Sequence, residues 1–257
     1  MDESSGIAIV TGAGSAEGIG FAVAKALGDA GMHVLITATT DRIRTRVSEL
    51  RARGVDADGV VADLTEDRGV DAVMDAAREA FGAPTVVVNN AGLTSVSRAD
   101  SPAPIDAISL AEWQTSIDRN LTTALRMTRA VLPAMIDAGY GRIVNVASLS
   151  GPVMAYRGDV AYHAAKAGMV GLTRAAAIDV ACFGITVNAV APGWIATSSS
   201  SEHELSMGAA TPIGRSGTAD EVASAVRFLA GRDASYITGQ ILVVDGANSI
   251  DEERGMP

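Results

Sequence analysis

The chain of 257 residues carries 20 basic and 30 acidic residues, for a formal net charge of -10, and 48% of it is hydrophobic. An acidic chain without a Lys/Arg cluster is a poor candidate for binding nucleic acid, and no apolar run reaches the roughly 18 residues of a membrane span. The one cysteine, Cys182, excludes an intramolecular disulfide framework, and we expect it to be a small core residue. Three scattered histidines have no ligand spacing, so we expect no metal. The acidic N-terminus does not resemble a signal peptide, and we expect a cytoplasmic protein.

Short apolar runs rich in Val and Ile alternate with longer segments of helical spacing. The expected strands, in chain order, are 7–10, 33–37, 59–61, 85–88, 142–146, 185–190 and 241–244. The expected helices are 19–29, 41–53, 69–81, 110–137, 160–183 and 219–229. Continuous apolar strands are buried on both faces, which indicates an α/β fold with a parallel sheet covered by helices.

We therefore predict a single Rossmann-like domain over residues 1–257, a doubly wound parallel sheet of about seven strands flanked by helices. The segments 93–109 and 198–218 have no clear pattern. Loops of this length are often functional, and we expect a substrate loop at about 194–218. The polar residues 247–257 are interpreted as a C-terminal tail.

A glycine-rich turn, TGAGSAEGIG, follows the first expected strand and precedes an expected helix. This is the context that a dinucleotide-binding turn requires, with Gly12, Gly14, Gly18 and Gly20 as candidates. The alternative is a turn that only connects a strand to a helix.

The end of the second strand indicates which dinucleotide binds. Thr39 and Thr40 are followed by Arg42 and Arg44, and hydroxyl and guanidinium groups there favour the 2′-phosphate of NADP(H) over NAD(H). Asp41 could instead bind a ribose hydroxyl, although we interpret it as a helix N-cap.

Tyr162 and Lys166 are four residues apart on an expected helix and therefore share a face. An ammonium favours the phenolate form of a nearby phenol, which suits acid/base chemistry. Packing beside a solvated lysine is the alternative. Ser148, with Ser150 as a substitute, ends a buried strand where open α/β sheets place their sites. Asn120 is a poor helix former within an expected helix.

With these pieces in order, the sequence resembles the short-chain dehydrogenase/reductase family over nearly its whole length. The matching segments are Thr11 to Gly20, Asp63-Leu64, Asn89 to Gly92, Asn120, Ser148, the Tyr162/Lys166 pair, Asn188 to Gly193 and Asp245-Gly246. The resemblance implies an NAD(P)H-dependent oxidoreductase in which hydride passes between nicotinamide and a ketone or secondary alcohol.

The resemblance also implies residue roles. Tyr162 is the general acid/base, Lys166 assists it and binds the nicotinamide ribose, Ser148 polarises the carbonyl and Asn120 supports a proton-relay water. The cofactor-binding residues it implies are Gly12, Gly14, Gly18, Ile19, Gly20, Thr39, Thr40, Arg42, Asp63, Leu64, Asn90, Ala91, Gly92, Tyr162, Lys166, Pro192, Gly193, Ile195 and Thr197. Asn89 would line the adenosine side with Ala91 and Gly92.

Three departures from the family pattern bear on cofactor and substrate. The glycine turn is two residues longer, with Ala16 and Glu17 as the apparent additions, and it lacks the arginine that many NADP-using members carry. The spacing from Ser148 to Tyr162 is one residue longer than is common. The chain looks most like 3-oxoacyl-acyl-carrier-protein reductases, yet Pro133 and Ile178 stand where those enzymes carry surface arginines for the carrier. We therefore expect a small or coenzyme-linked ketone as substrate.

Two other functions remain open, an NAD-dependent alcohol dehydrogenase and a non-catalytic dinucleotide-binding regulatory protein. The resemblance disfavours enoyl reductases, which space the tyrosine and lysine more widely. It also implies a homotetramer that pairs the helices at 110–137 and 160–183. The chain has 18 Arg and only two Lys, and we expect the second, Lys25, to lie on the exposed side of its helix.

Overall fold

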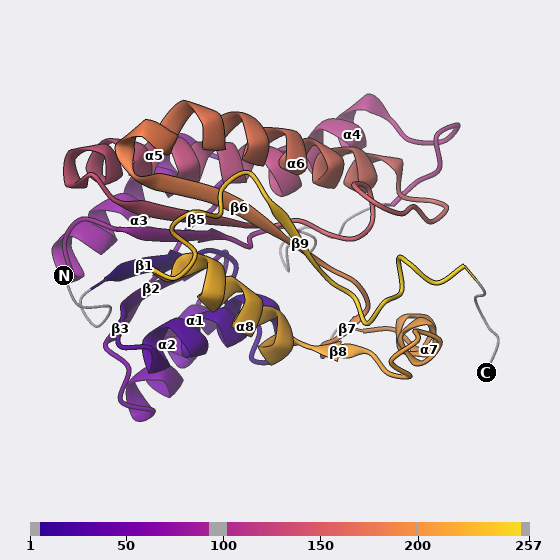
Figure 1. The fold of residues 1–257 in the computed structure, drawn as a ribbon, viewed down its shortest axis with the longest axis horizontal. Helices are drawn as coiled ribbons and strands as arrows, with labels where there is room; N and C mark the ends of the chain where they lie inside the picture. Colours follow the sequence, from indigo (N-terminus) through magenta and orange to yellow (C-terminus); the bar gives the residue numbers. More distant parts are fainter. Residues whose placement is uncertain (1–5, 93–101, 199, 253–257) are drawn as a thin grey trace.

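The computed structural model describes residues 6–92, 102–198 and 200–252. They form a seven-stranded parallel sheet with strand order β3-β2-β1-β4-β5-β6-β9 and helices on both faces (Figure 1). The strands of this sheet are β1 (Ile7–Val10), β2 (His33–Ala38), β3 (Ala57–Val61), β4 (Val86–Asn89), β5 (Gly141–Val146), β6 (Ile185–Pro192) and β9 (Ile241–Val244). The predicted doubly wound architecture is confirmed.

Two helical layers cover the sheet. The helices are α1 (Ile19–Asp29), α2 (Arg42–Ala52), α3 (Asp67–Ala80), α4 (Leu110–Ile117), α5 (Thr123–Ala138), α6 (Val160–Val180), α7 (Glu202–Ala209) and α8 (Ala219–Ala230). Neighbouring strand residues point to opposite layers. Ala8 and Val10 of β1 pack in the cluster with α1, α2 and α8, whereas Ile9 packs in the cluster with α3, α5 and α6. Both faces of each central strand are thus buried, which explains the continuous apolar runs.

The expected helix over 110–137 is three segments. Between α4 and α5 lies a π-helical segment, η2 (Asp118–Thr122), in which the Thr123 N–H bonds to the Asp118 carbonyl. Asn120 lies in this segment and is buried. The poor helix former that the sequence singled out therefore marks an irregular turn, of the kind that often occurs at functional sites.

The expected helix over 160–183 also ends early. After α6, the 3-10 segment η3 (Ala181–Phe183) leads to Gly184 in the left-handed conformation, with φ of +73°. Cys182 lies in η3 and is exposed, so the expectation of a core cysteine was wrong.

The segment without a predicted pattern contains α7 and a second, two-stranded sheet of β7 (Ile195–Ala196) and β8 (Gly217–Thr218). The strands are too short for any periodicity to show. The start of α7 was signalled, because Ser201 and Glu204 form a capping box. This segment, described except for residue 199, is structured rather than an open loop.

The described part of the expected C-terminal tail is held to the domain. The Asp245 carboxylate accepts hydrogen bonds from the N–H groups of Ala247 and Ser249, and Ile213 N–H donates to Gly246 O. Residues 253–257 of the tail and 93–101 of the unassigned segment lie outside the described residues. Among the helices described, none is long and apolar enough to cross a membrane.

Candidate active site

The turn between β1 and α1 lies against the end of β4, where the strand order reverses direction. Thr11 Oγ1 accepts from the N–H groups of Asn90 and Ala91 at 3.0 and 2.9 Å, and Asn90 Nδ2 donates to Thr11 O and Gly12 O. Gly12 has φ of +71°, and a Cβ on Gly20 would lie 2.5 Å from Asn90 Nδ2. Two of the candidate glycines are therefore required by the contact between the turn and β4.

The start of α1 suits a diphosphate group. Gly18 is the N-cap residue and offers the helix no capping side chain, and the first turn has no acidic residue. The first N–H groups of the helix, from Ile19 onward, can therefore bind an anion. Gly14 approaches β2 closely, because a Cβ there would lie 2.9 Å from Ala38 Cβ. The residues of this turn fit a dinucleotide.

The polar residues after β2 lie at the same edge of the sheet, where Thr39, Asp41 and Arg42 are exposed and Thr40 is half-buried. Arg42 Nε donates to Thr40 Oγ1 at 3.3 Å, beside Thr39. Asp41 is the N-cap residue of α2, but its carboxylate does not cap the helix and binds Arg44 Nε at 3.0 Å. The interpretation of Asp41 as a cap is correct in position and wrong in its hydrogen bond.

Asp63 and Leu64, which come after β3, have structural partners. Asp63 Oδ1 accepts from both the N–H and the hydroxyl of Thr65, at 2.9 and 2.6 Å, and the residue is exposed. Leu64 is buried in the core with α3 and α5. Contact of Leu64 with a cofactor would therefore involve its backbone, while the exposed Asp63 carboxylate retains an oxygen for a ligand.

Tyr162 and Lys166 lie on one face of α6, as predicted, and both are buried. Lys166 Nζ donates to Val146 O at 2.9 Å and lies 5.7 Å from the centre of the Tyr162 ring. Burial lowers the pKa of the Lys166 ammonium to about 8. The alternative of a solvated lysine is wrong, because the ammonium sits beneath the phenol at the carboxyl end of β5.

Ser148 and Asn120 come from two further elements, and Ser148 lies two residues after Val146, whose carbonyl binds Lys166. Ser148 comes after β5 and is half-buried, and its hydroxyl accepts from the Ser150 N–H at 3.1 Å. The backbone of Ser150, the alternative catalytic serine, thus binds the hydroxyl of Ser148. A Cβ on Gly92 would lie 2.7 Å from Asn120 Oδ1 and 3.7 Å from Lys166 Nζ, so only glycine fits between these two side chains.

The segment after β6 faces the glycine turn. Leu149 N–H donates to Pro192 O and Gly193 N–H to Val244 O, both at 2.9 Å. Ile195 pairs with Gly217 in the small sheet, and Thr197 N–H donates to Ser200 Oγ. A cleft of about 320 Å³ separates this segment from the turn, lined by Ala16, Glu17, Ala22, Lys25, Ala196, Thr197, Thr218, Ala219 and Asp220. The two additional residues of the turn therefore shape this cleft.

Lys25, which was expected on the exposed side of its helix, is half-buried and lines that cleft. Its Nζ lies 3.4 Å from Asp220 Oδ1 and 5.7 Å from the Phe21 ring, and its side chain is 27% exposed. The spacing of residues within α1 could not show this ion pair, because its acidic partner, Asp220, lies in α8.

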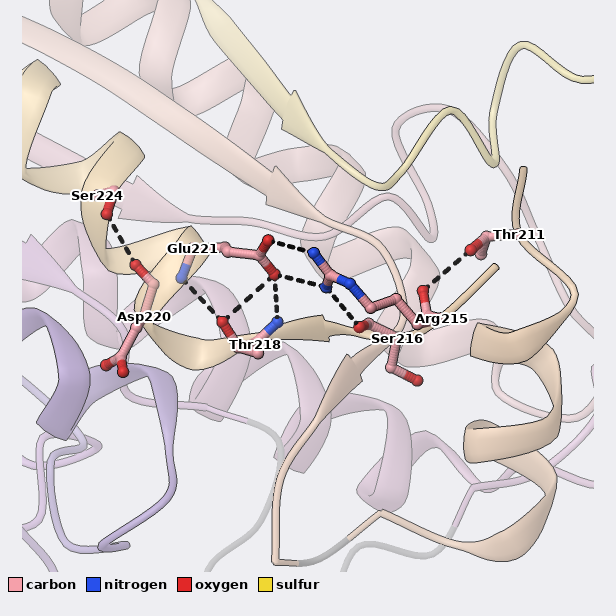
Figure 2. A network of polar contacts seen from close by, with 7 residues as sticks. All are labelled: Thr211, Arg215, Ser216, Thr218, Asp220, Glu221 and Ser224. Carbon is pink, nitrogen blue, oxygen red and sulfur yellow. Dashed lines mark hydrogen bonds and ion pairs between the residues drawn. The ribbon is translucent and has the colours of Figure 1, made fainter. Parts of the chain in front are cut away.

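A network of ionic and polar contacts fixes the other wall of the cleft (Figure 2). Arg215 binds Glu221 with both terminal nitrogens, at 2.9 and 2.7 Å, while Thr218 and Glu221 form the capping box of α8. The hydrogen bond from Arg215 is the main cause that lowers the pKa of Glu221 to about 2. The network holds β8 and the start of α8 in place.

Sequence reasoning missed Asp159, which is the N-cap residue of α6 and accepts from the Tyr162 N–H at 3.4 Å. An aspartate just before an apolar helical pattern was the available signal. Among the described residues, no three His, Cys, Asp or Glu side chains gather as a metal site would require.

Comparison with known proteins places this geometry in a family. A family model described as enoyl-(acyl carrier protein) reductase matches residues 12–247. A 3-oxoacyl-[acyl-carrier-protein] reductase of Pseudomonas aeruginosa is 40% identical over 250 residues, 93% of this chain and 96% of the relative. The chain belongs to the short-chain dehydrogenase/reductase family.

Other relatives differ in substrate. The cis-4-hydroxycyclohexanecarboxylate dehydrogenase of Sinomonas cyclohexanicum is 40% identical over 244 residues, 93% of this chain and 95% of the relative. The crystal structure of a variant of actinorhodin polyketide ketoreductase with NADPH superposes with a TM-score of 0.87 at 35% identity, over 96% of this chain and 98% of that one. This protein is accordingly an NAD(P)H-dependent oxidoreductase that acts on carbonyl and alcohol groups.

Proposed function

We propose that the protein is an NADP(H)-dependent reductase of ketones, with Asn120, Ser148, Tyr162 and Lys166 as its catalytic residues. The observation that carries this proposal is the Lys166 ammonium, buried beneath the Tyr162 ring and held by the last carbonyl of β5. Burying a cation costs free energy unless the cation has favourable partners. Here the ammonium favours the charged form of a neighbouring phenol.

The side chains divide the work on the substrate oxygen. The nicotinamide supplies a hydride to the carbonyl carbon when the cofactor is bound. The Ser148 hydroxyl donates a hydrogen bond to the carbonyl oxygen, and the Tyr162 hydroxyl gives that oxygen its proton. Lys166, with a pKa of about 8, remains mostly protonated at neutral pH and stabilises the phenolate left behind. Asn120, beside Gly92 and Lys166, would orient a water that returns the proton.

Substitution of the proposed acid tests this assignment. Tyr162→Phe should reduce ketone turnover by about 10²-fold or more while the cofactor still binds, because only the proton donor is lost. Tyr236→Phe is the matched control, since that tyrosine is fully exposed and is not one of the proposed site residues. Unchanged turnover by Tyr162→Phe would overturn the catalytic assignment, whereas a wild-type protein that binds the cofactor and reduces no ketone would favour the non-catalytic regulatory alternative.

The preference for NADP(H) rests on the exposed edge after β2. Arg42, Thr39 and Thr40 are available there, while the Asp41 carboxylate is occupied by Arg44. Titration of both reduced cofactors by fluorescence tests it, with a lower Kd expected for NADPH. A much lower Kd for NADH would support the alternative of an NAD-dependent alcohol dehydrogenase.

For the substrate, we favour a small or coenzyme-linked ketone over a carrier-bound acyl chain. Pro133 and Ile178 are both exposed, Ile178 to 81%, where the related carrier-using enzymes have arginines. An acidic protein without those cations would attract an acidic carrier weakly. Turnover of a panel of ketones, 3-oxoacyl thioesters and enoyl thioesters, free and carrier-bound, would distinguish these substrate classes. Far better turnover of a carrier-bound 3-oxoacyl chain than of its short thioester would overturn this choice.

The same surface supports the predicted oligomer. The outer faces of α5 and α6 carry exposed Leu125, Ile136 and Ile178, interspersed with small residues such as Ala167 and Ala175. Apolar helix faces with small side chains allow close packing of a second copy. We expect a homotetramer in light scattering, and a monomer would contradict it. The cytoplasmic location stays a prediction.

A further inference from the structure

The loop from Leu149 to Gly158 joins Ser148 to the start of α6, and it lies directly on that helix. Gly151 has φ of +102°, and a Cβ there would collide with His163 O. The backbone of the loop therefore meets α6 at His163, the residue next to the proposed acid Tyr162.

The His163 ring connects this loop to the helix cap through both of its nitrogens. Nε2 accepts from the Tyr156 N–H at 3.0 Å, and Nδ1 lies 2.6 Å from Asp159 O. Because a backbone N–H can only donate and a carbonyl can only accept, the ring must be neutral with its proton on Nδ1. No other protonation state satisfies both contacts.

Asp159 and Tyr156 complete this arrangement. Asp159 Oδ1 caps α6 at the Tyr162 N–H, and Asp159 Oδ2 accepts from the Tyr156 hydroxyl at 3.3 Å. The Tyr156 ring packs edge-on against His163, with 4.4 Å between ring centres. We call these three residues, Tyr156, Asp159 and His163, the loop clamp.

The clamp holds Tyr156 on the loop that joins Ser148 to the helix of Tyr162, and the residue is 45% exposed. Burial of the hydroxyl, then the charges of Asp159, Tyr162 and Glu204, raise the pKa of Tyr156 above its usual value. Tyr156 is therefore a neutral phenol, and the His163 ring that it packs against lies edge-on to the Tyr162 ring, with 6.2 Å between ring centres.

We infer that His163 is a positioning residue for the carbonyl substrate, whose neutral ring fixes the loop so that Tyr156 forms one wall of the substrate pocket. The inference rests on the proposed ketone reduction. Since His163 touches the loop and the cap rather than the reacting atoms, its loss disturbs the fit of the substrate more than the proton transfer.

The decisive experiment compares His163→Phe with His163→Gln on the best ketone of the panel. Phe keeps a ring but removes both hydrogen bonds, and we expect KM for the ketone to rise about tenfold, with kcat and cofactor Kd nearly unchanged. Gln keeps an acceptor near the Nε2 position and should restore most of the lost affinity. His33→Phe, at the opposite end of the sheet, is the control.

Unchanged KM in His163→Phe, or an equal loss of kcat and cofactor binding, would overturn the inference. A second measurement does not need activity. The chain has three histidines, so nitrogen NMR can assign each ring, and His163 should be the Nδ1–H tautomer with a slowly exchanging Tyr156 amide. An Nε2–H tautomer would exclude the clamp. A wild-type chain that reduces no ketone would overturn the proposed function instead, and the NMR result would still decide the clamp.

Discussion

The two ends of β5 hold two buried cations in different ways. At the amino end, Arg142 is 3% exposed, and its guanidinium donates to the carbonyls of Gly231, Gly141 and Gly184 and packs 4.4 Å from the Tyr140 ring. At the carboxyl end, Lys166 is equally buried, but within the described residues its ammonium donates to one carbonyl, that of Val146.

This difference separates a structural cation from a functional one. Burial lowers the pKa of both groups. Arg142 uses its hydrogen bonds to join β5 to two neighbouring loops. Lys166 has three donors and uses one on the protein, so two remain for a ligand. The end of the sheet with the incompletely bonded cation is also the end with the glycine turn, Ser148 and Asn120.

The largest effect should come from removing the compact ammonium. Lys166→Arg should reduce kcat/KM by about 10²-fold or more, because the planar guanidinium cannot occupy the space beneath the Tyr162 ring. Steady-state kinetics measure this. Lys25→Arg should change kcat less than about twofold, since the longer cation can still pair with Asp220. If both variants behave alike, the compact ammonium of Lys166 would have no special role.

At the other end of the strand, stability should change rather than activity. Arg142→Met removes the donor from the carbonyls of Gly141, Gly184 and Gly231, of which that of Gly141 lies in a buried hydrogen bond, and we expect the free energy of unfolding to fall by about 3 kcal/mol. Urea unfolding gives that value, and kcat per folded molecule should remain near that of the wild type. A large loss of kcat in a folded variant would erase the distinction between the two ends.

The glycine turn belongs to the functional end, and its closeness can be tested with a matched pair of variants. Gly20→Ala would bring a Cβ to 2.5 Å from Asn90 Nδ2 and 2.7 Å from Gly12 O. We expect the cofactor Kd to rise about tenfold or more as the turn shifts. Gly171→Ala, in α6 with open space around it, should be neutral or stabilise the helix by up to about 1 kcal/mol. Equal cofactor affinity in both variants would show that the close contact of the glycine turn with Asn90 is not needed for cofactor binding.

The burial of Lys166 should also appear in the pH dependence of stability. Its pKa falls from 10.5 to about 8 on folding. Between these values the unfolded chain binds more protons than the folded one, so this residue makes stability rise as the pH rises. Lys166→Met should remove that rise. The measurement is the difference in unfolding free energy between wild type and variant across the interval between the two pKa values, and a constant difference would show that the ammonium is not desolvated.

The smallest effect concerns an exposed carboxylate of the cleft wall. The pKa of Glu221 is lowered to about 2 by Arg215, so its contribution to stability is present above the ordinary pKa of a carboxyl group and is lost as the pH falls toward 2. Because the pair is partly exposed, solvent and salt weaken it. Glu221→Gln should lower the melting temperature slightly at neutral pH and no longer do so once the pH reaches the lowered pKa, and the difference should shrink in high salt.

The sequence predicted the features that depend on residues close together in the chain. Apolar runs marked the strands, and the spacing of Tyr162 and Lys166 placed both on one helical face. What it could not predict depends on partners from distant segments. The ion pair of Lys25 could not be predicted because Asp220 lies on another helix, and the bond from Lys166 to Val146 O depends on the packing of α6 against β5. The irregular helical turn at Asn120 was visible only as a poorly placed residue.

That irregular turn has a consequence for how the chain tolerates length changes. Each residue of an α-helix advances the side chains by about 100°, and the wider turn at η2 absorbs one residue without rotating the helix beyond it. Met127, Val131 and Met135 of α5 face the sheet, while Asn120 faces the site. Deleting one residue within 118–122 would restore a regular helix but turn one of these two faces away. The segment sets the rotation of α5 relative to α4, so a single-residue deletion there should lower stability or activity more than most substitutions do.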